Sequence, residues 1–154
     1  MDAIAMLKTD HDEIKQLLKR LERTTGRDGD AKTRERLFAT VKGELTVHEI
    51  IEEEIFYPEL KGHPMAKDLV LEGYQEHHVV DLLMGELESL SVEDETWGAK
   101  AQVMQENIEH HIAEEEDEMF KIARQVFEAD ELDELGDRME QRRQSARQEL
   151  NIPA

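Results

Sequence analysis

Apolar residues recur along this chain at intervals of three and four, and short polar breaks separate the runs. That spacing places them on one face of a helix with about 3.6 residues per turn. The four stripes expected to face inward are Ile4, Leu7, His11, Ile14, Leu18 and Leu21; Leu37, Val41, Leu45, His48, Glu52 and Ile55; Ala66, Val70, Gly73, His77, Val80, Met84 and Leu87; and Met104, Ile108, His111, Glu115, Met119, Ile122 and Val126. Because no alternating strand pattern accompanies them, the sequence predicts an all-α fold.

Capping residues and breaks indicate where the first helices begin and end. Asp2 and Asp30 are placed to cap the first two helices, and the stretch 24–29 separates them. Pro58 lies near the end of the second helix. Gly62-His63-Pro64 forms the next break, and its proline suits the first turn of a third helix.

The same approach predicts two further helices. Ser91 with Asp94 resembles a capping box that opens a fourth helix over roughly 93–127. Asp130 is placed to cap a fifth helix, whose basic end is typical of a helix C-terminus. Short connections favour an up-down-up-down four-helix bundle over residues 1–127. We expect residues 128–154 to form an additional C-terminal helix and tail that pack on the bundle or extend from it.

Two stripes carry a histidine followed four residues later by a glutamate, at positions where core leucines are expected. His48 precedes Glu52, and His111 precedes Glu115. Four residues are just over one helical turn, so each pair lies on one face and within reach of a common metal ion. A buried carboxylate needs a partner to remain charged. The two pairs therefore predict a buried metal site.

An internal repeat supports this interpretation. His11 and His77 stand on the other two stripes, each follows an acid, and apolar residues follow both at the same offsets. In an up-down-up-down bundle, inward residues of all four helices converge. Four histidines and two glutamates would then meet at one level of the core, which is a set that can hold two metal ions.

Other interpretations of single residues remain open. A lone histidine on an apolar stripe is more often a hydrogen-bonded core residue than a ligand, and a single His-x-x-x-Glu can arise by chance in an acidic chain. Glu49, next to His48, and Tyr74, three residues before His77, are candidates for additional ligands or for partners of the ligands. His63 is assigned to the surface, and Glu53, Glu54, Glu114 and Glu116 are assigned to a solvated acidic rim. His78 and His110 lie about 100° round the helix from the neighbouring stripe histidines, so they are expected to flank the ligands or to be their partners.

Composition narrows the functional classes. The chain of 154 residues has 38 acidic and 19 basic side chains, and the resulting charge of −19 disfavours nucleic acid and anionic membranes as partners. It has no cysteine, which excludes disulfides and thiolate chemistry and fits a cytoplasmic location. No signal peptide or membrane-spanning run is apparent. The sequence identifies no protein partner.

These residues resemble the haemerythrin-like, or HHE cation-binding, family over residues 1–127. The resemblance implies a non-haem di-iron centre in a four-helix bundle, with two iron ions joined by both glutamates and by an oxo or hydroxo bridge. No acid/base pair, nucleophile–base arrangement or substrate-pocket signature appears elsewhere in the sequence, so we expect no separate catalytic or cofactor-binding residue, and any catalysis would belong to the metals. The ligands that the resemblance implies are His11, His48, Glu52, His77, His111 and Glu115.

Two departures from the oxygen-carrying haemerythrins argue against simple oxygen transport. Those proteins have a further histidine one turn before the third-helix ligand, where this chain has Gly73. They also end the fourth-helix motif with an aspartate five residues on, where this chain has Glu115 at four. We expect the glycine to leave room beside the metals, either for an exogenous ligand or for Tyr74.

The expected function is therefore the binding of iron and of a small ligand such as oxygen or nitric oxide, in sensing, storage or a stress response. The alternative is a di-iron enzyme that decomposes peroxide or oxidises a small ligand. A metal-free helical interaction protein is a third possibility, and zinc in place of iron stays open. Ferritin-like di-iron chemistry is excluded, because none of the seven histidines has a glutamate three residues before it.

Overall fold

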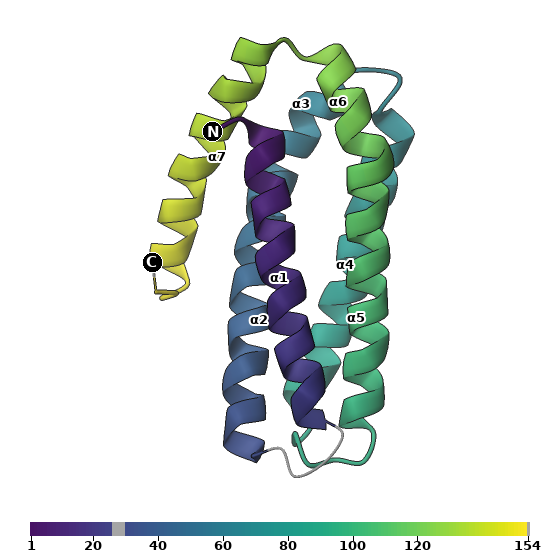
Figure 1. Ribbon diagram of the computed structural model, residues 1–154, viewed down its shortest axis with the longest axis vertical. Helices are drawn as coiled ribbons and strands as arrows, with labels where there is room; N and C mark the ends of the chain where they lie inside the picture. The colour runs from purple at the N-terminus through teal and green to yellow at the C-terminus, as the bar shows by residue number, and fades with distance from the viewer. Residues whose placement is uncertain (26–29, 154) are drawn as a thin grey trace.

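Within residues 1–25 and 30–153, which the computed structural model describes, four long helical segments lie side by side and a fifth helix runs along the outside (Figure 1). The elements are α1 (Ala3–Thr25), α2 (Ala31–Ile51), the π-helical turn η1 (Glu52–Phe56), α3 (Tyr57–Lys61), α4 (Lys67–Ser89), α5 (Trp97–Glu114), the π-helical turn η2 (Glu115–Met119), α6 (Phe120–Val126) and α7 (Ala129–Glu149). Consecutive segments connect at alternate ends, which confirms the predicted up-down-up-down bundle with a C-terminal helix.

The caps of the first two helices lie where the sequence places them. Asp2 Oδ1 accepts a hydrogen bond from the Ala5 backbone N–H at 2.8 Å, and Asp30 Oδ1 accepts one from Lys32 at 3.1 Å. Each satisfies a backbone donor that the first turn of a helix leaves free. Of the break predicted at 24–29, residues 26–29 lie outside the described residues.

Three predicted helix starts were wrong. The third long helix begins at Lys67, so Pro64 belongs to the preceding turn. The fourth begins at Trp97 and not near residue 93, because the Asp94 carboxylate accepts from Thr96 N–H at 2.8 Å and closes a turn before the helix. The fifth is capped by Glu128 in a reciprocal capping box with Glu131, so its predicted cap lies inside the first turn.

In the described part of the chain, two apolar clusters fill the bundle, one on each side of a polar level. One cluster includes Ile4, Leu7, Phe56, Leu60, Val70 and Phe120, and the other includes Ile14, Leu18, Leu45, Val80, Trp97 and Ile108. Along each long segment, the change from one cluster to the other occurs at or shortly after the histidine of the inward stripe. The polar level is therefore shielded from solvent at both ends of the bundle.

The π-helical turns change which residues face inward beyond Glu115. The predicted stripe continued through Ile122 and Val126, but these side chains are only half-buried. Ala123 and Phe127 are buried instead, one position later in each case. A π-helical turn contains an extra residue, so every position after η2 is shifted by one relative to a regular α-helix.

The fifth helix, α7, packs against α1, α2 and η1. Its buried residues include Leu132, Leu135, Met139 and Ala146. At Gly136 an added Cβ would lie 2.2 Å from the Met1 carbonyl oxygen, so α7 approaches the start of α1 too closely for any side chain there. Among the described residues, no helix combines the length and apolar character that crossing a membrane requires.

Candidate metal centre

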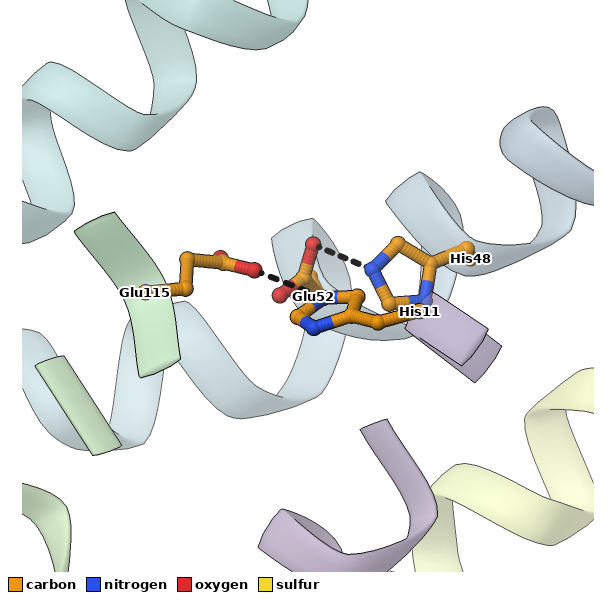
Figure 2. A group of neighbouring side chains, drawn as sticks. All are labelled: His11, His48, Glu52 and Glu115. Carbon is orange, nitrogen blue, oxygen red and sulfur yellow. Dashed lines mark hydrogen bonds and ion pairs between the residues drawn. The ribbon is translucent and has the colours of Figure 1, made fainter. Parts of the chain in front are cut away.

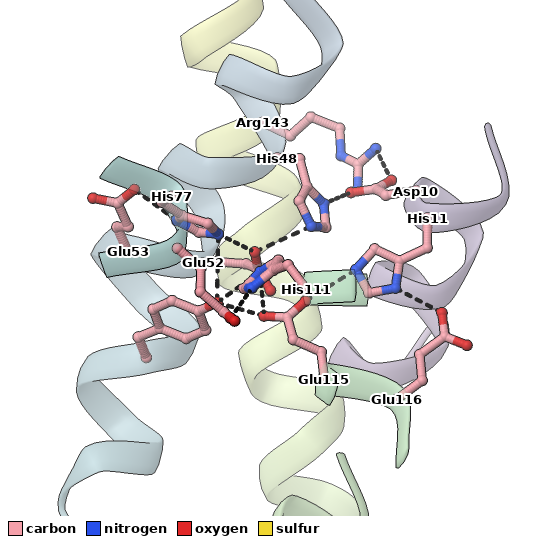
Figure 3. Close-up of polar contacts among 12 residues, drawn as sticks. Asp10, His11, His48, Glu52, Glu53, His77, His111, Glu115, Glu116 and Arg143 are labelled. Carbon is pink, nitrogen blue, oxygen red and sulfur yellow. Dashed lines mark hydrogen bonds and ion pairs between the residues drawn. The ribbon is translucent and has the colours of Figure 1, made fainter. Parts of the chain in front are cut away.

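The six residues that helical spacing singled out lie together at the polar level of the bundle (Figure 3). All six are buried, and Glu52 and Glu115 are 0 and 1 % exposed. His11 comes from α1, His48 from α2, and each glutamate is the first residue of a π-helical turn. The internal repeat of the sequence thus corresponds to two helical hairpins that face each other.

Among the described residues, the donor atoms of this cluster form two groups, in each of which all atoms lie within 4.8 Å of one another. The first group is His11, His48, Glu52 and Glu115, which Figure 2 shows, and the second is His77, His111, Glu52 and Glu115. Both carboxylates belong to both groups. The arrangement therefore offers two adjacent cation positions with shared carboxylates.

Each glutamate faces one imidazole of each group. Glu52 Oε1 lies 3.1 Å from His48 Nε2 and 3.2 Å from His77 Nε2. Glu115 Oε1 lies 3.1 Å from His11 Nε2, and its Oε2 lies 3.3 Å from His111 Nε2. The four Nε2 atoms consequently point toward the shared carboxylates, as ligands of a common centre would.

Several buried atoms at this centre have no hydrogen-bond partner. Among the described residues these include His48 Nε2 and both carboxylate oxygens of Glu52. Buried polar groups are nearly always paired, and leaving one unsatisfied costs about 1–3 kcal/mol. A cation is a partner that imidazole nitrogen and carboxylate oxygen can share, so the residues present fit a metal ion.

A carboxylate binds the outer nitrogen, Nδ1, of every imidazole in the cluster. The Nδ1 atoms of His11, His48, His77 and His111 lie 2.7, 3.0, 2.9 and 2.6 Å from Glu116, Asp10, Glu53 and Glu76, respectively. Such contacts fix the orientation of the ring, favour a proton on Nδ1, and leave Nε2 for a metal. The assignment of Glu53 and Glu116 to a solvated rim was therefore wrong.

These outer partners follow the internal repeat, although the contacts cross between helices. Asp10 directly precedes His11 but binds His48 on the next long segment. Glu76 directly precedes His77 and binds His111 in the same way. Glu53, which follows the shared Glu52, binds His77, and Glu116, which follows the shared Glu115, binds His11. The acids that hold the imidazoles therefore stand at equivalent positions of both repeats.

The carboxylates strongly favour protonated imidazoles. Burial alone would lower the pKa of His48, but the charge of Glu52 and the hydrogen bond that the ring donates to Asp10 raise it to about 10. For His77, burial is likewise outweighed by the contacts with the carboxylates of Glu52 and Glu53, and the pKa rises to about 9. In the metal-free protein, protons on the imidazoles therefore balance the negative charge of the carboxylates. A cation that binds here must displace these protons.

Tyr57 is a residue of this centre that helical spacing did not identify. Its hydroxyl donates a hydrogen bond to Glu115 Oε2 and lies 3.4 Å from both His77 Nε2 and His111 Nε2. Burial and the charges of Glu115 and Glu52 raise its pKa well above the usual value, which keeps the hydroxyl protonated as a donor. The π-helical turn η1 directly precedes this residue and rotates it inward.

The ring of Tyr57 occupies the room that Gly73 leaves. A Cβ at Gly73 would lie 2.9 Å from Tyr57 Oη and 3.1 Å from its Cζ. The prediction that this space admits an exogenous ligand or Tyr74 was therefore wrong. Tyr74 is half-buried, and its hydroxyl donates to the Glu53 carbonyl oxygen at 3.2 Å, outside the cluster.

Glu49 is buried beside the cluster. Donor atoms of Glu49, Glu53 and His77 lie within 4.8 Å of one another. Burial raises the pKa of Glu49 to about 9; the charge of His77 acts against this, and a hydrogen bond that protonated Glu49 donates to the Asp81 carboxylate acts in the same direction as burial. Glu49 also lines a cavity of about 20 Å³ together with the four imidazoles of the cluster and apolar side chains. This cavity has room for about one water-sized molecule.

The other histidines lie apart from the six-residue cluster. His78 is exposed, and His110 is 67 % exposed and contacts Glu114 at 3.0 Å on the outside of α5. The ring of His63 packs edge-on against Phe127, with ring centroids 5.2 Å apart.

A helical bundle that encloses imidazoles around shared carboxylates defines a class of proteins built to hold cations. This chain belongs to the family described as Hemerythrin HHE cation binding domain, whose family model matches residues 2–123. A search of curated proteins finds none that matches the chain significantly.

Among solved structures, the chain is similar to a Hemerythrin HHE cation binding domain-containing protein from Mycobacterium kansasii. The two share 26 % sequence identity with a TM-score of 0.83, and the match covers 97 % of this chain and 89 % of the other. The match therefore continues beyond the bundle into α7.

Proposed function

We propose that this protein is a non-haem di-iron protein that binds a small ligand such as oxygen or nitric oxide, in sensing, storage or a stress response in the cytoplasm. The observation that carries the proposal is the pair of four-residue donor groups that share Glu52 and Glu115. Two separate structural ions would not need shared carboxylates. The proposed ligands are His11, His48, Glu52, His77, His111 and Glu115.

The sharing of carboxylates supports iron more than structural zinc. A closed structural zinc site takes four donors of its own, whereas the two positions here share both of their carboxylates. Iron takes more ligands than four, so iron bound here would supply redox chemistry and open positions for a small ligand. The cavity of about 20 Å³ lies against all four imidazoles and gives such a ligand a place beside the metals.

Residues around the six proposed ligands orient them and shield them from water. The outer carboxylates orient the imidazoles, and the apolar clusters on either side exclude bulk water. Tyr57 presents a hydroxyl inside the second donor group, where it can serve as an oxygen ligand or donate a hydrogen bond to a bound molecule. Either role would distinguish the His77 position from the His11 position.

Metal analysis combined with an ultraviolet-visible spectrum tests the proposal. We expect wild-type protein to hold two iron ions, and His111→Ala to lose one equivalent or more. His110→Ala is the matched control, because that side chain is exposed and points away from the centre. Retention of both ions by His111→Ala, or their loss from His110→Ala, would contradict the assignment.

A second candidate function is decomposition of peroxide, which the buried hydroxyl of Tyr57 favours because it places a proton donor beside the metals. We expect iron-loaded wild-type protein to consume peroxide, Tyr57→Phe to do so more slowly while holding both ions, and His48→Ala not to do so. If wild-type protein binds two irons but does not consume peroxide, the binding function stands and the enzymatic one fails.

A further inference from the structure

The four carboxylates that bind the outer imidazole nitrogens do not have equal surroundings. The side chains of Glu53, Glu76 and Glu116 are 36, 21 and 27 % exposed, whereas that of Asp10 is 8 % exposed. Among the described residues, Asp10 is also the one of the four to which an arginine binds. The imidazole of His48 therefore depends on a buried carboxylate that itself needs a cationic partner.

That partner is Arg143, which reaches Asp10 from α7, outside the four-helix bundle (Figure 3). Its Nη1 lies 2.8 Å from Asp10 Oδ1, and its Nη2 lies 3.1 Å from Asp10 Oδ2. A two-point contact of this kind fixes the plane of the carboxylate as well as its position. Asp10 Oδ2 in turn lies 3.0 Å from His48 Nδ1. Polar contacts thus run without interruption from the fifth helix to a proposed ligand.

Arg143 also lies between open solvent and His48. On its outer side is a surface hollow of about 740 Å³, lined by Glu13 of α1, Glu44 of α2, residues of α7 and Ile152. On its inner side is a void of about 10 Å³, lined by the same two glutamates together with Asp10 and His48. Arg143 lines both spaces. A shorter side chain would join them and admit water to the hydrogen bond that orients His48.

We propose that Arg143 is a positioning residue for one of the two metal positions, and that the fifth helix thereby sets how firmly that ion is held. The inference rests on the proposed di-metal function. Arg143 orients Asp10, Asp10 orients the ring of His48, and His48 belongs to the donor group of His11 but not to that of His77. Loss of the arginine therefore weakens retention of one ion and leaves the other.

The attachment of α7 does not depend on this one contact. Its apolar residues are buried in a core cluster that includes residues of α1. Its other arginines form ion pairs with the bundle, such as Arg147 with Glu44 at 2.8 Å and Arg142 with Glu54 at 2.9 Å. Arg142→Gln is a matched control, because it removes the same charge from the adjacent residue without a contact to the cluster.

The experiment measures release of Fe²⁺ from the anaerobic, metal-loaded protein into an excess of a coloured ferrous chelator. For Arg143→Gln we expect one of two equivalents to leave at least about ten-fold faster than from wild type, because removal of an outer partner of a metal ligand typically weakens metal affinity by about 10–100-fold. The second equivalent should leave at the wild-type rate. Arg142→Gln should match wild type in both phases, and Arg143→Lys, which keeps the charge but not the two-point contact, should be intermediate.

Unchanged release from Arg143→Gln, or equal acceleration of both equivalents, would overturn the proposal, since general loosening of the fold affects both ions. If circular dichroism shows that Arg143→Gln does not fold, the same release measurement is made on Arg143→Lys. Unchanged release, or equal acceleration of both equivalents, would then overturn the proposal. The stoichiometry of the wild-type protein reports separately on the proposed function. Fewer than two ions in wild type would overturn that function and this inference with it.

Discussion

At the scale of single residues, Gly73 shows how a missing side chain on one helix makes room for a polar group from another. Tyr57 is fully buried, and its ring stacks on that of His77 with centroids 5.4 Å apart. It also meets Tyr74 edge-on at 5.1 Å. The ring is therefore confined on several sides and cannot shift without repacking its neighbours.

We expect Gly73→Ala to lower the free energy of unfolding of the metal-free protein by up to about 2 kcal/mol, because overpacking usually costs about 1–3 kcal/mol. The new Cβ would lie 2.9 Å from Tyr57 Oη, which outweighs the gain of about 1 kcal/mol in helix propensity. Urea unfolding provides the measurement. Gly85→Ala in the same helix is the control and should stabilise, because nothing lies within 4 Å of its Cβ. Stabilisation by both substitutions would show that the tyrosine ring does not occupy the space beside Gly73.

The residues of the centre were predictable to different degrees. His48 with Glu52, and the equivalent pair of the second repeat, are one helical turn apart, so local spacing alone places them on one face. The outer partners of the imidazoles are not local, since Asp10 binds a histidine 38 positions away. In a chain with 38 acidic residues, spacing cannot distinguish such a carboxylate from one in solvent. Only the arrangement of the helices in space identifies them.

At the scale of elements, the π-helical turns η1 and η2 begin at the shared glutamates, Glu52 and Glu115. Because each turn begins at the glutamate, the histidine one turn earlier and this glutamate stay on one face. The residues after the turn are shifted by one position relative to a regular α-helix. Apolar residues occupy both the regular and the shifted positions after Glu115, so periodicity could not reveal the extra residue. This is why the inward stripe was predicted correctly as far as Met119 and wrongly beyond it.

The extra residue leads to a test by deletion. Removing Asp117, an exposed residue of η2, should restore a regular α-helix and keep Phe120, Ala123 and Phe127 on their present face. Removing the exposed Glu109 from α5 should instead rotate the following residues by about 100° relative to the residues before it.

We therefore expect the deletion of Asp117 to leave a folded protein and the deletion of Glu109 to abolish metal binding and lower the thermal midpoint strongly. Circular dichroism during heating and metal analysis measure both outcomes. Equal tolerance of the two deletions would contradict the assignment of η2 as the site of the shifted register.

At the scale of the whole molecule, the proposed ions and the protons of the metal-free protein stabilise the same buried carboxylates. Metal removal should lower the thermal midpoint, because a ligand that binds only the folded state adds its binding free energy to folding, about 2.7 kcal/mol at a hundred-fold excess over Kd. The size of this difference should depend on pH. In the metal-free protein, raised pKa values near 10 for His48 and 9 for His77 favour folding below the unfolded value of 6.5.

That contribution is lost as the pH rises through 9 and 10, so the metal-free protein should become less stable between pH 7 and 10. The metal-loaded protein should change less, because ions have replaced the titrating protons. Thermal midpoints of both forms at several pH values measure the difference. A metal-free protein that is more stable at pH 10 than at pH 7 would contradict the protonated state of these imidazoles.

The sharing of Glu52 and Glu115 has a mechanical consequence. The hairpin that contains α1 and α2 provides three donors of the first group, and the hairpin that contains α4 and α5 provides the fourth, Glu115. For the second group, α4, α5 and η2 provide three donors and the first hairpin provides Glu52. Neither hairpin alone carries a complete set for either position. With both ions bound as proposed, each ion crosslinks the two hairpins, so the hairpins cannot separate without breaking metal–ligand bonds at both positions. Resistance of the molecule to a pulling force across the bundle would then depend on the metals more than on the apolar packing.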